Sequence, residues 1–261
     1  MALGAPPPVT AARTRLLVPA RVMAVARTPI APRAASLALF VERYVLSLFF
    51  LYYAAHQIEP IRTQASGLLL DAATFPSLVK LVLLFLLNVL VGVLLLVSRR
   101  PAVPPTTRED VLVPLVGNFF YLAYNFVDLA PPWLARNLFP SSWQLPLSFA
   151  ALYLGVLALA LAVWAVVHLG RSFAILVSVR PVVLSGPYRF VRHPMYLGYI
   201  FLMIGLVAAL GSILVLLLTV IHLLLTVWRA RLEEARLSAH SPEYREYVRR
   251  AGFLLPRLGE K

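Results

Sequence analysis

The 261-residue chain contains no cysteine. Disulfides, thiolate metal sites and a cysteine nucleophile are therefore excluded. Charged residues are also scarce, at 13%, whereas 61% of the residues are hydrophobic and the mean hydropathy is +0.82. A soluble domain of this length could not bury so much apolar surface, so we expect most of the chain to lie in a lipid bilayer.

Acidic residues are few, with 11 Asp and Glu against 24 Lys and Arg, which gives a formal net charge of +13. A charge of this size can indicate nucleic-acid binding. Here, however, the cations fall between apolar runs, as the positive-inside rule describes for membrane proteins. We therefore predict no nucleic-acid partner, and we also predict no metal site.

Five apolar runs predict the membrane-spanning helices. They cover residues 37–58, 77–98, 111–130, 145–169 and 195–228. Each of the first four has the length of one helical span, about 20 residues. The fifth is too long for one crossing, and Gly211-Ser212 near its middle predicts a tight turn between two helices. The predicted fold is therefore an all-α membrane bundle of about six spans, with a helical hairpin at 195–228.

The positions of Lys and Arg predict how this bundle is oriented. With both termini in the cytosol, the inner segments hold 20 of the 24 cations, and the outer loops hold only Arg62 and Arg136. A five-span model would disrupt this distribution. The abundance of Ala, Arg and Pro is typical of a GC-rich genome, so we favour a bacterial inner membrane over the endoplasmic reticulum.

The chain divides into three regions by composition. Residues 1–36 are rich in Ala, Pro and Arg and contain no acid, which predicts a disordered basic tail, with a transit peptide as the alternative. Residues 37–169 form a four-span membrane region. Residues 170–261 combine the predicted hairpin with most of the polar residues that are candidates for a site.

The stretch "SGPYRFVRHPMYLGYIF", residues 185–201, places cations directly before a membrane helix. His193 precedes a proline, which disfavours helical geometry, and Pro194 suits the first position of the next helix. Arg189, Arg192 and His193 therefore lie where free N–H groups and the positive end of the helix dipole point. This arrangement predicts an anion site for a carboxylate or a phosphate, whereas Arg171 and Arg180 are interpreted as contacts to lipid headgroups.

Two adjacent acids, Glu233 and Glu234, lie where the last span leaves the membrane. A solvated helix face, with Glu233 paired to Arg236, is the simpler interpretation. A short hairpin, however, would bring these acids beside the cationic helix start. S-adenosylmethionine, with its carboxylate, ammonium, ribose hydroxyls and sulfonium, needs this mixture of charges, whereas a dinucleotide would need the cations without the acids.

Two motifs identify a resemblance. The segment "LGRSFAILVSVRPVVLSGPYRFVRHPMYLGY", followed by "RLEEARL" and "PEYREYVRRAGFLLP", resembles the isoprenylcysteine carboxyl methyltransferase and phospholipid methyltransferase superfamily over about residues 168–258. The resemblance implies an integral membrane methyltransferase that uses S-adenosylmethionine and receives a lipophilic or small acceptor from the bilayer. It makes 170–261 the cofactor-binding and catalytic region.

The resemblance also implies roles for individual residues. Gly186, Pro187 and Tyr188 would shape a cofactor loop. His193 and Tyr196 would hold the methionine end, with Arg192 nearby, and Gly198 would belong to the same cofactor site. Glu233 and Glu234 would bind the ribose or amino groups, and Tyr244 and Tyr247 would line or cover the pocket.

The methyl acceptor decides which residues act in the reaction. A carboxylate needs no base, and Arg229 or Arg231 could orient it. An amine or a thiol must lose a proton, and Glu233, Glu234 or His193 could accept it. Two other functions remain as alternatives: an NADPH-dependent membrane reductase of the steroid-reductase type, and a transporter, which would place ionisable residues near the bilayer midplane.

Overall fold

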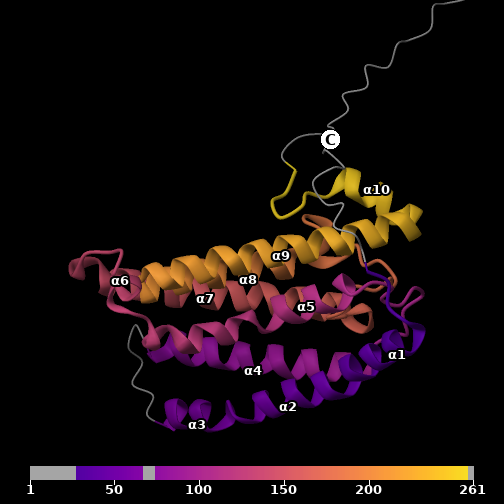
Figure 1. Ribbon diagram of the computed structural model, residues 1–261. Coiled ribbons are helices and arrows are strands. Elements are labelled where there is room, and N and C mark those ends of the chain that lie inside the picture. The colour runs from indigo at the N-terminus through magenta and orange to yellow at the C-terminus, as the bar shows by residue number, and fades with distance from the viewer. Residues whose placement is uncertain (1–27, 67–73, 258–261) are drawn as a thin grey trace, which may run out of the picture.

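The computed structural model describes residues 28–66 and 74–257, and its regular elements are helices (Figure 1). The first half contains α1 Pro32–Phe40, η1 Val41–Leu46, α2 Ser47–Ala55, α3 Ile58–Ser66, α4 Thr74–Val97, α5 Glu109–Phe119 and η2 Phe120–Leu129. The second half contains α6 Pro132–Ala135, α7 Ser141–Leu169, η3 Gly170–Ser172, η4 Gly186–Arg189, α8 Pro194–Leu210, α9 Ile213–His240 and α10 Pro242–Arg250.

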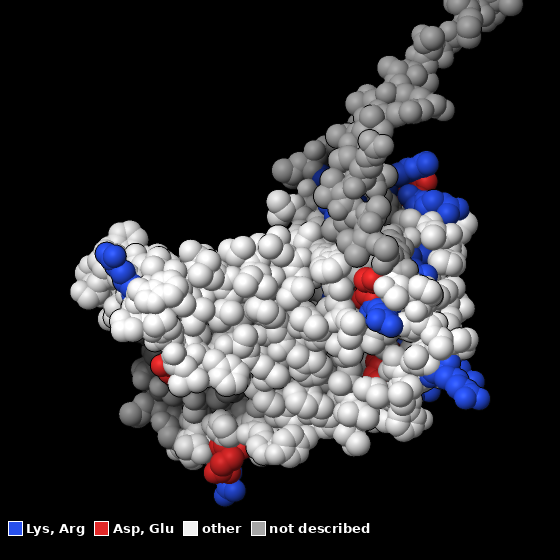
Figure 2. Space-filling model, in the orientation of Figure 1, with Lys and Arg blue, Asp and Glu red and all other residues white. Residues whose placement is uncertain are grey.

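Five helical segments are long and apolar enough to cross a membrane. They are Pro32–Ser66, Thr74–Val97, Glu109–Leu129, Ser141–Ser172 and Ile213–His240. Figure 2 shows a broad uncharged belt across their middle, with charged side chains gathered toward the ends of the molecule. Because apolar side chains remain exposed over this belt, the protein is a multi-pass integral membrane protein.

The predicted hairpin is confirmed at its turn. Gly211 ends α8 with a left-handed backbone (φ 56°), and the Ser212 hydroxyl accepts a hydrogen bond from Val215 N at 3.2 Å to cap α9. The α8 arm has only 17 residues, so its crossing of the bilayer stays a prediction. The start of α1 and α10 lie at the same end of the bundle (Figure 1), as a cytosolic location of both termini requires.

The first span differs from its prediction in two ways. Most of the predicted tail, residues 1–27, lies outside the described residues, but α1 already begins at Pro32, a residue whose fixed φ suits a helix start. The span also contains one π-helical segment, η1, that periodicity did not predict. Irregular turns of this kind are frequent at functional sites.

Gly198 lets α8 approach α7 closely. A Cβ atom at this position would lie 2.8 Å from the carbonyl oxygen of Ala158. Replacing Gly198 with valine is expected to push the two helices apart and to lower stability by about 1–3 kcal/mol. Thermal unfolding in detergent measures this loss, with Ala209→Val on the exposed face of α8 as the control. Equal melting temperatures of the two variants would contradict the close packing.

Candidate functional site

The loop before α8 is built around one glycine. Gly186 has φ 60°, and a Cβ atom there would lie 2.2 Å from the His168 ring, so only glycine fits. Pro187 then sits in the short η4 turn, and Tyr188 is buried behind it. His193 occupies the N-cap position and Pro194 the first turn of α8, as the sequence predicts.

The two acids on α9 face different partners because successive helical side chains point about 100° apart. Glu233 Oε1 accepts from the Tyr196 hydroxyl at 2.5 Å and from Arg229 Nε at 3.1 Å. Glu234 Oε1 instead accepts from Arg192 Nε at 2.6 Å and lies 3.2 Å from His193 Nε2. The start of α8 and the end of α9 are therefore joined through both carboxylates.

Aromatic rings surround this junction. The His193 ring stacks on Tyr196, with centroids 5.2 Å apart and an interplanar angle of 8°, and meets the edge of Phe253 at 5.0 Å. The guanidinium of Arg229 also lies over the Tyr196 ring, with its central carbon 5.2 Å from the ring centroid. The side chains that carry charge are thus held within an aromatic frame, which strengthens their interactions.

Helix α10, which follows α9 in the sequence, covers one side of the site. Ser241 caps α10 by accepting from Tyr244 N at 3.1 Å, as predicted, and thereby aims Tyr244 and Tyr247 inward. The Tyr247 hydroxyl donates to the carbonyl of Tyr188 at 2.5 Å and lies 3.2 Å from that of Val191. Burial raises the pKa of Tyr188, Tyr244 and Tyr247, so these phenols stay neutral at physiological pH.

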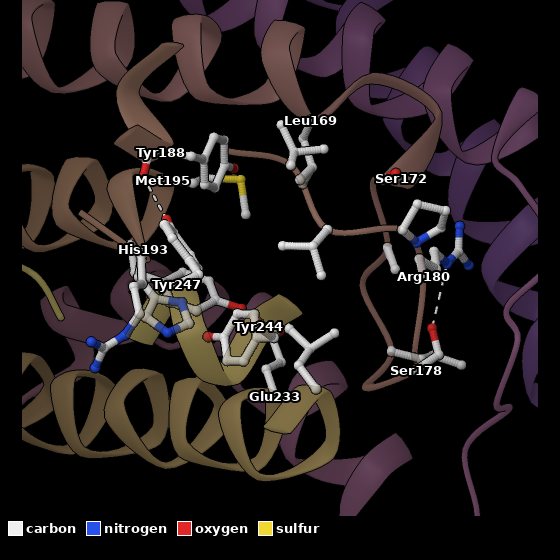
Figure 3. Close-up of a pocket in the computed structure, with 18 residues that line it drawn as sticks. Leu169, Ser172, Ser178, Arg180, Tyr188, His193, Met195, Glu233, Tyr244 and Tyr247 are labelled. Carbon is white, nitrogen blue, oxygen red and sulfur yellow. Dashed lines mark hydrogen bonds between the residues drawn. The ribbon is translucent and has the colours of Figure 1, made fainter. Parts of the chain in front are cut away.

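A cavity of about 130 Å³ lies between these elements (Figure 3). Seven predicted site residues line it: Tyr188, Arg192, His193, Tyr196, Glu233, Tyr244 and Tyr247. The rest of its wall is mostly apolar and comes from Leu169 at the end of α7, Ser172 of η3, the 174–183 segment, Met195 and Leu237. One cavity thus combines a carboxylate, cations, hydroxyl groups and apolar surface.

Other predicted site residues do not line the cavity. Gly198 contacts α7, and Arg229 and Glu234 stand behind the residues that do line it. Arg231 is half-exposed and lies over the Phe253 ring at 4.6 Å. Gly186 and Pro187 shape the loop through their backbone. These residues therefore support the cavity from outside its surface.

The anion site predicted for the arginines needs correction. Arg192 is bound within the protein, because it donates to Glu234 and to the carbonyls of Val248 at 3.1 Å and Ala251 at 2.7 Å. Arg189 is exposed and lies over the Phe190 ring. The Arg192 guanidinium is therefore not free to neutralise a phosphate, and Arg189 does not line the cavity described above.

Two further interpretations were wrong. Arg180 is not a headgroup contact: it is 6% exposed and forms an ion pair with Glu42 at 3.0 Å. Arg236 does not pair with Glu233, because it binds Asp110 at the start of α5 instead. Both partners belong to the first half of the chain, so the local spacing in the sequence gave no sign of either pair.

The geometry agrees with the comparison to known families. Residues 147–240 match the model of the phospholipid methyltransferases, from within α7 to the end of α9. This segment, about a third of the chain, is similar to the phospholipid methyltransferases. Comparison with curated proteins gives no match.

The match to the phospholipid methyltransferases implies the activity. The protein is a membrane methyltransferase that uses S-adenosylmethionine and acts on a lipid-like acceptor. It is therefore an enzyme, and the reductase and transporter alternatives lose their support. The matched segment contains the cationic helix start and both acids on α9, whereas the third segment of the resemblance, residues 242–256, lies outside it.

Proposed function

We propose that the cavity between α8, α9 and α10 binds S-adenosylmethionine and that the methyl group passes to a lipid-like acceptor that arrives from the bilayer. The observation that carries this proposal is the junction of His193, Tyr196 and Glu233 in one cavity wall. It combines an acid, an imidazole and an aromatic face at the end of two membrane helices.

The donor set of the cavity fits the cofactor. Both hydrogen bonds that Glu233 makes within the described residues end on Oε1, so Oε2 is available to an ammonium or a ribose hydroxyl. Tyr244 offers an aromatic ring to a cation, and Leu176 and Val183 offer apolar surface to a base. S-adenosylmethionine supplies the reactive methyl group on a positively charged sulfur.

The volume of the cavity implies movement on binding. Small-molecule sites usually measure about 300–1,000 Å³, whereas this cavity measures about 130 Å³. We therefore propose that α10 shifts outward to admit the cofactor and then packs over it through Tyr244 and Tyr247. Backbone hydrogen exchange across 242–250 should slow when S-adenosylmethionine is added to the full-length protein.

The supporting residues have separate roles in this proposal. Arg229 holds Glu233 in place and also donates to the carbonyl of Ile175 at 2.9 Å. Glu234 is committed to Arg192 and His193, so Glu233 and His193 are the better candidates to accept a proton from an amine or a thiol. A carboxylate acceptor would need no base, and orientation alone would accelerate its reaction.

A second cavity, of about 240 Å³, suits the apolar part of the acceptor. Eight of its nine lining residues are apolar, contributed by α1, η1, α5 and Leu176, and the ninth is Glu42. Leu176 also lines the cofactor cavity, so one side chain separates the two spaces. We propose that the acceptor's hydrocarbon chain lies here, on the cytosolic side of a bacterial inner membrane.

Filling the second cavity should affect the acceptor and not the cofactor. Ala38→Phe is expected to raise the KM for a lipid acceptor about tenfold, because the apolar chain loses buried surface worth about 1.5 kcal/mol or more. The dissociation constant for S-adenosylmethionine should stay within about twofold. Ala160→Phe, on the exposed face of α7, is the matched control. An unchanged KM in Ala38→Phe would place the acceptor elsewhere.

The experiment that tests the function uses the detergent-solubilised, full-length protein. Equilibrium titration should show binding of S-adenosylmethionine and none of NADPH. Incubation with the methyl-labelled cofactor and a total membrane extract should then transfer the label to a lipid-soluble product, whose identity defines the acceptor. Binding of NADPH alone, or a label that reaches only water-soluble products, would contradict the proposal.

A further inference from the structure

The segment 173–180 forms one wall of the cofactor cavity. It is irregular, and alternate residues, Ala174, Leu176, Ser178 and Arg180, line the cavity, as Figure 3 shows for Ser178 and Arg180. The four residues between them, Phe173, Ile175, Val177 and Val179, are buried in the protein. Such alternation is the period-two pattern of an extended strand. The backbone position of this segment therefore sets the width of the cavity.

The first half of the chain holds this backbone in place. Glu42 Oε1 accepts from Ile175 N at 2.7 Å and from Leu176 N at 2.8 Å. The carbonyl of Asp110 accepts from Val177 N, and that of Val103 accepts from Val179 N, both at 3.0 Å. All three acceptors lie before residue 147, outside the segment that matches the phospholipid methyltransferase family.

Glu42 is the charged member of this set. Glu42 is 2% exposed, and its side chain extends from the π-helical segment η1 of the first span. Its second oxygen, Oε2, accepts from Arg180 Nη2 at 3.0 Å, while Arg180 Nη1 donates to the carbonyl of Phe173 at 2.7 Å. One carboxylate thus fixes both the backbone of the wall and the guanidinium of Arg180, which is one of the residues that line the cavity.

Burial of this pair needs an explanation beyond stability. Removing two charges from water costs several kcal/mol per ion, so an apolar pair of similar volume often stabilises a protein equally well. A pair that fixes a ligand-binding wall, in contrast, has a use that an apolar pair cannot supply. The three donors on Glu42 satisfy the carboxylate in one geometry only.

We propose that Glu42 is a positioning residue for methyl transfer: from the first membrane span it holds the 173–180 segment, and Arg180 with it, at the spacing that cofactor binding requires. This proposal rests on the assignment of the cavity to S-adenosylmethionine. It gives the first half of the chain a defined part in the activity, although the family match covers none of that half.

Graded substitutions separate the two parts of the contact. Glu42→Gln keeps a carbonyl oxygen for the two backbone donors but removes the charge opposite Arg180, whereas Glu42→Leu removes both. We expect the dissociation constant for S-adenosylmethionine to rise about tenfold in Glu42→Gln and further in Glu42→Leu, since hydrogen bonds to charged groups contribute about 1.5–3 kcal/mol.

A double-mutant cycle tests whether Glu42 acts through Arg180. The combined variant Glu42→Gln/Arg180→Gln should bind S-adenosylmethionine more tightly than the product of the two single effects predicts, because each single change leaves one charge buried without its partner. Glu59→Gln on the exposed surface of α3 is the matched control and should leave both affinity and melting temperature unchanged.

The outcomes separate this proposal from the assigned activity. If Glu42→Gln lowers the melting temperature but binds S-adenosylmethionine within about twofold of the wild type well below that temperature, Glu42 supports the fold alone and the proposal is overturned. The proposal is also overturned if the effects of Glu42→Gln and Arg180→Gln on the free energy of S-adenosylmethionine binding are strictly additive. If the wild-type protein itself fails to bind S-adenosylmethionine, the assigned cofactor site falls as well.

Discussion

Replacing Glu233 with glutamine is expected to weaken S-adenosylmethionine binding by about 10- to 150-fold, the equivalent of one lost charge-assisted hydrogen bond worth about 1.5–3 kcal/mol. The change removes the negative charge but keeps an oxygen for Tyr196 and Arg229. The free oxygen of the side chain then loses its attraction for a cationic or hydroxyl group, and the ion pair with Arg229 is weakened as well. Isothermal titration of the detergent-solubilised protein measures the effect.

The control for this variant is Glu246→Gln. Glu246 lies on the exposed surface of α10 and pairs only with Arg249 and Arg250 within the described residues. Its replacement should leave cofactor affinity unchanged, because exposed ion pairs contribute little. Similar affinities of the Glu233 and Glu246 variants would show that Glu233 is not a cofactor ligand.

Arg192→Ala is expected to destabilise the protein by about 3–5 kcal/mol, because it leaves the largely buried Glu234 without its strongest partner. The guanidinium also joins α8 to the end of α10 through the carbonyls of Val248 and Ala251. Its loss should lower the melting temperature by about 10 °C and should raise hydrogen exchange throughout α10.

The matched control is Arg250→Ala, because the Arg250 side chain is 77% exposed and its ion pair with Glu246 lies in water. This change should shift the melting temperature by no more than about 2 °C. If Arg192→Ala and Arg250→Ala have the same melting temperature, the connection between α8 and α10 is not what holds the cavity closed.

The sequence predicts the junction of α8 and α9 because the turn between them is short. Because only Gly211 and Ser212 connect them, α8 and α9 run side by side. The helix start at His193 and the acids on α9 must then meet at the other end. Local signals therefore predict the contact between His193 and Glu234, although 41 residues separate them.

The contacts of Glu42 could not be predicted from local signals in the sequence. Arg180 lies 138 residues away, and no short turn or periodic pattern links the two positions. An acid within an apolar run and an arginine in a loop each have a plausible local interpretation, so neither indicates the other. Arg192 presents the same difficulty, since the carbonyls that bind it belong to the end of α10 and carry no side-chain signal.

Ultraviolet cross-linking of methyl-labelled S-adenosylmethionine tests the location of the cofactor most directly. Irradiation of the full-length protein, followed by digestion and mass spectrometry, identifies the peptide that carries the label. We expect the label on the peptides that contain Tyr188 to Tyr196 or Tyr244 to Tyr247, with competition by unlabelled cofactor. Label confined to residues 28–66 or 109–129 would contradict a binding site at the meeting point of the last membrane helices.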